Sequence, residues 1–207
     1  SSLLSSNYRL NLHNSLNNPE LYRSDNQHLT HLLKGHEGCV NCLQWSHDGR
    51  WLLSGSDDRT LIINKYTPGG LEAPEKAFSL QNRFKSGHFK NIYDAKFDPI
   101  NETRIVSAGA DGFVCVVDDW TIQSARRESS VSRTLRADSK GFGTKSLEFI
   151  DANNVLIACE DGHLIQFDLR QKKPARKVLL DMSSMRSSSS PYSMSQCPSA
   201  PHMLALS

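Results

Sequence analysis

No hydrophobic run in the sequence approaches the ~20 residues that a membrane-spanning helix requires. Net charge is also small, because 24 Lys and Arg residues against 22 Asp and Glu residues leave +2 at pH 7. This balance excludes the strongly basic composition that is typical of proteins binding nucleic acid or anionic membranes. The opening stretch SSLLSSNYRLNL has too few consecutive apolar residues for a secretory signal. We therefore expect neither a membrane nor a nucleic acid as a partner.

Cysteine is scarce, with five residues at Cys39, Cys42, Cys115, Cys159 and Cys197. An odd number without a regular spacing does not form a disulfide framework and suits a reducing compartment. Cys39 and Cys42 do form a C-x-x-C pair, which belongs either to a zinc or redox site or simply to a strand. No second Cys or His pair follows at ligand spacing. We expect no metal or other cofactor, and an intracellular protein of the nucleus, the cytoplasm or both.

What the sequence does contain is an internal repeat. From Gly35 onward, short apolar runs are bounded by Gly, Asp, Asn and Ser, a pattern that predicts β-strands. Asp58, Asp111 and Asp161 each follow the second apolar run of a repeat, and they are 53 and 50 residues apart. The repeats read VNCLQW, WLLSGSDD and TLIIN; then IYDAKF, RIVSAGAD and FVCVV; then KSLEF, VLIACED and HLIQF.

These repeats predict an all-β chain in which each unit is a small sheet. A variable fourth strand is expected within 66–88 and again within 119–141. We place the units at roughly 34–84, 85–136 and 137–181, with the start of a fourth at 190–207. Residues 1–33 form an N-terminal extension, partly helical or irregular, and 34–207 form the repeat domain. The chain ends before the acidic turn of its fourth unit, as a truncated repeat would.

The repeats resemble the WD repeats of β-propellers. The resemblance is carried by the Gly35-His36 start, by the SGSDD turn and by the strand that ends in an aromatic-Asp pair, and it covers roughly residues 33–207. It implies a partial propeller of about three blades plus the start of a fourth, because closed propellers contain 4–8 blades. The usual Trp-Asp pair is altered in every repeat, to Asn64-Lys65, Val117-Asp118 and Phe167-Asp168.

The loss of the tryptophans has a physical consequence. An indole buries a large apolar surface, which Asn64 and Val117 do not replace. We therefore expect looser packing between blades, or compensation by a neighbour such as Trp45 or Trp51.

A histidine, a serine and an aspartate occur at matching places in the first two repeats: His36, Ser54 and Asp58, and then His88, Ser107 and Asp111. A hydrolase would need one such set with an exposed Ser54, and it would gain nothing from a copy in the next repeat. A structural network does gain, because each repeat has the same buried turn to satisfy. In WD repeats these positions form a His–Ser–Asp hydrogen-bond relay, so the resemblance implies a structural role and no enzymatic activity.

The third repeat keeps only part of this relay. Asp161 is present, but the histidine position falls on or near Ser139 and the serine position falls on Ile157. We expect this repeat to be the least regular of the three.

The end of the third repeat, Phe167-Asp168-Leu169-Arg170, resembles the W-D-x-R box of WD proteins that act as substrate receptors of cullin-4 ubiquitin ligases. In that family the arginine of the box projects into the ligase's adaptor, a protein of three propellers. Arginine suits this role because its planar fork makes several charge-assisted hydrogen bonds at once. The resemblance implies that Asp168 and Arg170 bind the adaptor.

Further stretches, GCVN, SGHFKNIYDAKF and EDGHLIQFDLR, resemble one branch of these receptors. That branch includes the WD-and-tetratricopeptide-repeat (adipose) protein and the nuclear receptor interaction protein. The implied function is a substrate receptor that bridges the adaptor to a protein substrate which the sequence does not identify. The alternative is a general WD-repeat scaffold for chromatin or signalling complexes, without a role in ubiquitin ligation.

Overall fold

The computed structural model describes residues 33–67, 77–122, 131–137, 141–171, 176–182, 193–197 and 200–206. Every regular element in these ranges is a β-strand. None of the residues described forms a helix long and apolar enough to cross a membrane. All but the last residue of the expected N-terminal extension, 1–33, lies outside the described ranges.

Three four-stranded antiparallel sheets and one two-stranded sheet follow each other along the chain. The first contains β1 (Val40–Trp45), β2 (Trp51–Ser56), β3 (Thr60–Tyr66) and β4 (Phe78–Lys85). The second contains β5 (Ile92–Phe97), β6 (Ile105–Gly109), β7 (Phe113–Val117) and β8 (Arg133–Arg136). The third contains β9 (Thr144–Phe149), β10 (Asn154–Cys159), β11 (His163–Asp168) and β12 (Lys177–Asp181). The last pairs β13 (Met194–Cys197) with β14 (Ala200–Leu206).

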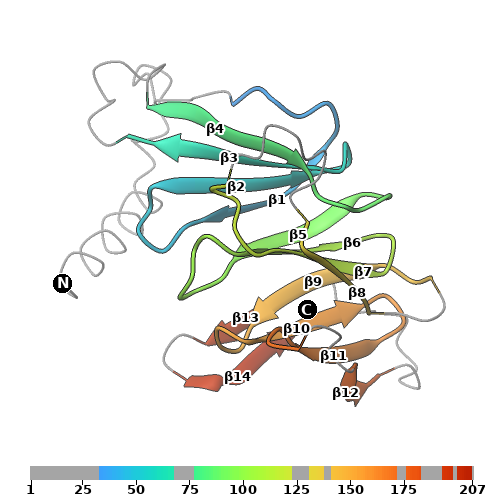
Figure 1. The fold of residues 1–207 in the computed structure, drawn as a ribbon. Coiled ribbons are helices and arrows are strands. Elements are labelled where there is room, and N and C mark those ends of the chain that lie inside the picture. The colour runs from blue at the N-terminus through green and yellow to red at the C-terminus, as the bar shows by residue number, and fades with distance from the viewer. Residues whose placement is uncertain are drawn as a thin grey trace, which may run out of the picture.

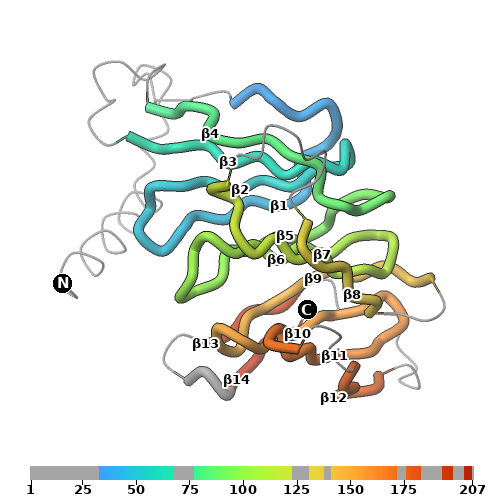
Figure 2. The backbone as a smooth tube through the Cα atoms, viewed as in Figure 1, coloured from blue at the N-terminus to red at the C-terminus, as the bar shows by residue number. Residues whose placement is uncertain are grey.

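The sheets are arranged in space in the same order as in the chain (Figure 1). In Figure 2 the tube passes from blue in the first sheet through green to orange and red in the last two. Strands β1, β5, β9 and β13 begin their sheets, and each contacts the next one; we call them the inner strands. The prediction of an all-β, partial propeller with three sheets and the start of a fourth is confirmed.

The core lies between successive sheets because their middle strands are apolar on both faces. A continuous apolar run of this kind is typical of a strand buried on both sides. Between the first and second sheets the fully buried side chains include Leu53, Ile63, Ile92 and Ile105. The next two clusters are packed in the same way. Between the second and third sheets the buried residues include Val106, Val114, Leu147, Ile157 and Phe167, and between the third and fourth they include Leu156, Leu164 and Met194.

The inner strands are also joined by a recurring hydrogen bond. The carboxylate of Asp94 in β5 accepts the N–H of Leu147 in β9 at 2.8 Å. One sheet later, the hydroxyl of Ser146 accepts the N–H of Met194 at 3.2 Å. Cys42 in β1 holds the equivalent place, with its sulfur near the N–H of Ala95, and burial raises the pKa of this thiol to about 12. The two cysteines of the C-x-x-C pair thus differ, because Cys42 is partly buried within β1 whereas Cys39 is exposed just before the strand.

Strand pairing in the third sheet is as regular as in the first. Each of these sheets has two shifts of register, whereas the second sheet has one. By this measure the third repeat is less regular than the second and equal to the first, so strand pairing alone does not set it apart. The third repeat does differ at the polar turn, where Ile157 replaces the relay serine and pairs with Leu147 and Ile165.

Two tryptophans, Trp51 and Trp120, compensate for the altered Trp-Asp pairs. Of the two neighbours that the sequence suggested, Trp45 and Trp51, only Trp51 takes part. Trp120 is buried, packs edge-on against Trp51 with ring centroids 5.2 Å apart, and donates its Nε1–H to the carbonyl of Glu102. Trp51 thus contributes as predicted. Trp45 does not, because its ring is exposed and packs only on Tyr66 and Phe78. Trp120 lies three residues after Val117, outside the strand where the usual tryptophan would be.

We expect Trp120→Ala to lower the free energy of unfolding by about 3–5 kcal/mol, because it removes a buried ring and leaves a cavity between two sheets. Trp45→Ala is the matched control. It removes the same side chain from an exposed site and should cost clearly less. Urea unfolding followed by circular dichroism measures both, and equal losses would contradict the role given to Trp120.

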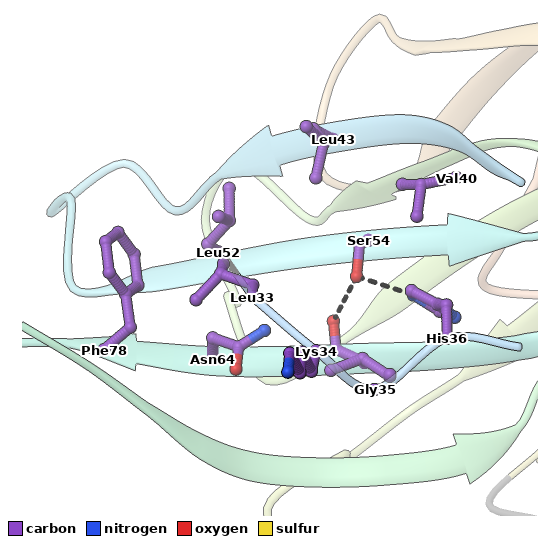
Figure 3. Close-up of a pocket in the computed structure, with 11 residues that line it drawn as sticks. Leu33, Lys34, Gly35, His36, Val40, Leu43, Leu52, Ser54, Asn64 and Phe78 are labelled. Carbon is purple, nitrogen blue, oxygen red and sulfur yellow. Dashed lines mark hydrogen bonds between the residues drawn. The ribbon is translucent and has the colours of Figure 1, made fainter. Parts of the chain in front are cut away.

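One face of the first sheet remains open among the described residues. Leu43 and Ala95 hold equivalent places, opposite Ser54 and Ser107, yet Leu43 is 64% exposed and Ala95 is 1% exposed. The first sheet covers Ala95, whereas no sheet in the described ranges covers Leu43. Figure 3 shows the result, a groove of about 370 Å³ lined mainly by apolar side chains that include Val40, Leu43 and Phe78.

We expect the 207-residue chain to self-associate through this face, because an open apolar face beside a sheet edge is prone to aggregation. Leu43→Asp should shift the chain toward monomer in analytical ultracentrifugation, since a carboxylate opposes burial of the face. Ile122→Asp is the control, because Ile122 is as exposed as Leu43, at 65%, but follows the third strand of the second sheet. A reversible, monomeric wild-type chain would show the expectation to be wrong.

Candidate functional site

The first predicted relay residues lie in direct contact. His36 Nε2 is 2.8 Å from Ser54 Oγ, and His36 Nδ1 is 3.1 Å from Asp58 Oδ2 (Figure 3 shows the serine contact). Asp58 also accepts the backbone N–H groups of Glu37 and Thr60 at 2.8 and 2.9 Å. Burial acts to raise the pKa of Asp58, but these hydrogen bonds outweigh it and hold the pKa well below its ordinary value. The carboxylate thereby ties the segment before β1 to the β2–β3 turn.

The second relay repeats this geometry. His88 Nδ1 is 2.9 Å from Asp111 Oδ1, and His88 Nε2 is 3.0 Å from Ser107 Oγ. Asp111 accepts the backbone N–H groups of Phe89 and Phe113. Because the same contacts recur with the same atoms, the two sets hold equivalent turns of equivalent sheets.

The third turn is held differently. Asp161 accepts the N–H of His163, whose ring Nδ1 lies 2.8 Å from Asp161 Oδ2. The segment before β9 is instead tied by Glu160, which accepts the N–H of Gly143 at 2.8 Å and pairs with Lys145. Ser139, the expected histidine position, lies outside the described residues. Sequence reasoning missed Glu160, although an acidic residue directly before Asp161 was a visible signal.

The relay serines are poorly placed for nucleophilic chemistry. Ser54 is only 6% exposed, and its hydroxyl lies 3.4 Å from the carbonyl oxygen of Ile62. A nucleophile needs space for a substrate carbonyl and for the donors that stabilise its oxyanion. Within the described ranges, no group of three or more His, Cys, Asp or Glu side chains is arranged to hold a metal ion. The low exposure of Ser54 and its hydrogen bonding to His36 favour the structural interpretation of the relay over the hydrolase alternative.

The second relay makes stability depend on pH. Burial alone would lower the pKa of His88, but its hydrogen bond to Asp111 outweighs burial and raises the pKa to about 9. Because this value exceeds the ordinary 6.5, protonated His88 stabilises the fold fully below about pH 6.5, and the contribution is lost as the pH rises toward 9. We expect the urea midpoint to fall across that window.

The variant Asp111→Asn removes the cause of the raised pKa and should flatten this part of the pH profile. His88→Asn should do the same at a lower overall stability. A wild-type midpoint that is constant from pH 6.5 to 9 would contradict the expectation.

The predicted adaptor-binding residues form a second, separate site at the end of β11. Arg170 is 66% exposed at its side chain, and two of its nitrogens contact Asp168, Nε at 2.9 Å from Oδ1 and Nη2 at 2.7 Å from Oδ2. The hydrogen bond from Arg170 lowers the pKa of Asp168 to about 2. This contact uses two of the five N–H groups that a guanidinium carries. Asp151 also interacts electrostatically with Arg170, and most of the guanidinium side chain remains exposed.

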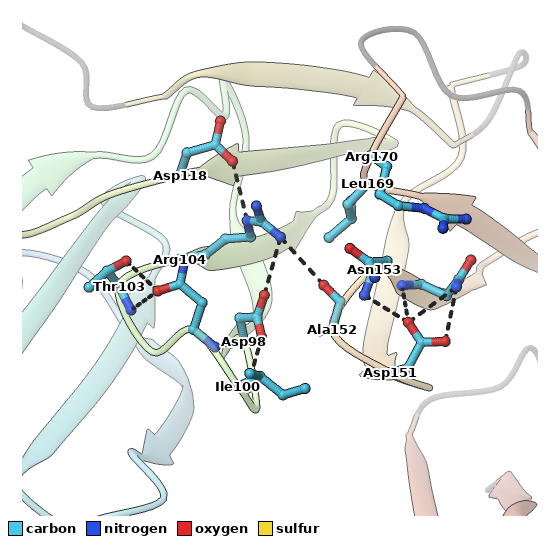
Figure 4. Close-up of polar contacts among 12 residues, drawn as sticks. Asp98, Ile100, Thr103, Arg104, Asp118, Asp151, Ala152, Asn153, Leu169 and Arg170 are labelled. Atoms are coloured by element: carbon cyan, nitrogen blue, oxygen red, sulfur yellow. Dashed lines mark hydrogen bonds and ion pairs between the residues drawn. The ribbon is translucent and has the colours of Figure 1, made fainter.

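Arg133 holds the backbone on both sides of Arg170, and Arg104, shown in Figure 4, is linked to it through a shared carboxylate. Arg133 of β8 donates to the carbonyl oxygens of Leu169 and Gln171, the residues on either side of Arg170. Its other end pairs with Asp118 at 2.9 Å, and Asp118 also pairs with Arg104. Sequence reasoning missed Arg104 and Arg133. The contact of Arg133 with Leu169 spans 36 positions and that of Arg104 with Ala152 spans 48, so both depend on which loops become neighbours in the fold.

The exposed arginine is specific to the third sheet. The equivalent positions, two residues after Lys65 and Asp118, are occupied by Thr67 and by Trp120, which is buried. The Asp168–Arg170 pair is thus a property of one sheet, unlike the relays, which are shared by two.

Serial four-stranded sheets, inner strands that contact each other and repeated His–Ser–Asp relays define a WD-repeat fold. In agreement, the family model "WD domain, G-beta repeat" matches residues 27–63. The chain is a WD-repeat protein.

The chain is similar to part of several longer proteins. It is 32% identical to "WD repeat protein iqw1" of Schizosaccharomyces pombe, over 84% of this chain and 21% of the relative. It is 34% identical to human "WD and tetratricopeptide repeats protein 1", over 72% and 20% respectively. It is 30% identical to human "DDB1- and CUL4-associated factor 6", over 84% and 19%. The resemblance to the WD-and-tetratricopeptide branch is confirmed, and the chain spans about a fifth of the length of the curated relatives it matches.

Proposed function

We propose that this chain belongs to a substrate receptor of a cullin-4 RING ubiquitin ligase. In this role it catalyses no reaction itself and bridges the ligase adaptor to a protein substrate in the nucleus, the cytoplasm or both. The observation that carries the proposal is Arg170, an exposed guanidinium held by Asp168 on one sheet only. Similarity to relatives named DDB1- and CUL4-associated factors supports it.

The chemistry of the Asp168–Arg170 pair suits an interface. A side chain already held by an ion pair loses less conformational freedom when a partner binds. Exposed arginines are also enriched among the few residues that dominate binding energy at interfaces. The carbonyl contacts of Arg133 add to this by fixing the backbone on both sides of Arg170.

A general WD-repeat scaffold without a ligase role remains the second candidate. It is supported by the first two relays, which stabilise the fold whatever the chain binds, and it assigns no binding role to Arg170. The two candidates differ in what happens when Arg170 is removed.

We expect Arg170→Ala to weaken binding of the purified adaptor by about 30-fold, the loss of a binding hot spot worth roughly 2 kcal/mol. Biolayer interferometry with the 207-residue chain measures this. Arg50→Ala is a matched control, because Arg50 is equally exposed at 66% and pairs with Asp48 two residues before it. It should change the affinity less than twofold. Wild-type affinity in Arg170→Ala would favour the scaffold.

A further inference from the structure

The turns beside Arg170 carry exposed aliphatic side chains. Strands β5 and β9 end at the same edge of their sheets as β7 and β11, because they run parallel to them. Two hydrogen bonds show this closeness: Trp120 donates its N–H to Thr103, and Leu169 donates its N–H to Asn153. Ile100 lies in the turn after β5 and Ile150 in the turn after β9, and both side chains are exposed.

Within the described residues, the exposed aliphatic side chains in the turns after the inner strands belong to the second and third sheets, whereas the first sheet has the exposed ring of Trp45 at the end of β1. Ile100 is 79% exposed, in a turn where no packing requirement within the described residues calls for isoleucine. The turn after β1, at the same edge of the first sheet, reads Ser-His-Asp-Gly-Arg and has no aliphatic residue. Single exposed apolar residues are ordinary on a protein surface, but their grouping on one face indicates an interaction site.

Both turns are held rigidly by polar contacts (Figure 4). Asp98 accepts the N–H of Ile100 at 2.9 Å, and Asp98 is in turn paired with Arg104 at 3.2 Å. The same guanidinium lies 3.4 Å from the carbonyl oxygen of Ala152, so it joins the turn after β5 to the turn after β9. Turns fixed in this way present their side chains without an added ordering cost on binding.

We propose that Ile100, Ile150 and Arg170 form one docking surface across the second and third sheets, and that its occupant is the ligase adaptor. The inference rests on the proposed function and names the part of the surface that accompanies the arginine. The adaptor would present a carboxylate or carbonyl oxygen to Arg170 and apolar side chains to the two isoleucines. A charged anchor beside desolvated apolar contacts is the usual composition of an interface centre.

The test uses the purified adaptor and the 207-residue chain carrying Ile100→Ser and Ile150→Ser together. Serine removes the apolar surface without adding a charge beside Arg170. We expect the affinity to fall at least about tenfold, from the lost burial of two aliphatic side chains. Ile100→Val with Ile150→Val should keep binding within about threefold. Leu80→Ser, an exposed leucine on β4, is the control and should bind as wild type.

The outcomes separate this inference from the proposed function. If Arg170→Ala weakens binding and the serine variant binds as wild type, the docking surface is refuted and the receptor function stands. If neither variant changes an adaptor affinity that is measurable in wild type, both are refuted. Unchanged urea midpoints in the serine and valine variants show that a loss of affinity does not come from unfolding.

Discussion

Packing between consecutive sheets is the interaction on which the rest of the structure depends. The middle strands of each four-stranded sheet are apolar on both faces, and a single sheet cannot bury these faces by itself. Leu53 and Ile63 are buried only because the second sheet covers them, and Val106 and Val114 only because the third does. The hydrogen bonds between inner strands, such as that from Leu147 to Asp94, keep successive sheets in a common register.

The two kinds of polar site follow from this arrangement at opposite edges of the sheets. Relays such as His88–Asp111 lie where the chain enters each sheet, and they satisfy buried turn groups. Arg170 lies where the third strand leaves, with its guanidinium in solvent. The edge with the relays thus maintains the fold. The edge with Arg170 is free to vary from repeat to repeat, which suits the binding function proposed for it.

The repeat pattern predicted the strands closely because strand formation depends on local alternation and turn residues. The run VNCLQW is β1 and IYDAKF is β5, residue for residue. The relay contacts of His36 and His88 were also accessible, since their residues recur at fixed spacing. Compensation by Trp120 was not, because the position lies past the end of a strand and its burial depends on a ring from the previous sheet.

The all-β repeat, the order of the sheets and the residues of the first two relays were predictable from the sequence, because each arises from short-range patterns copied along the chain. Three features were not: the contacts of Arg133 on both sides of Arg170, the contact of Arg104 with Ala152, and the exposure of Leu43 where Ala95 is buried. These contacts depend on which loops and faces of different sheets become neighbours. The local alternation of apolar and polar residues does not indicate which loops become neighbours, since side chains of the same type recur in every repeat.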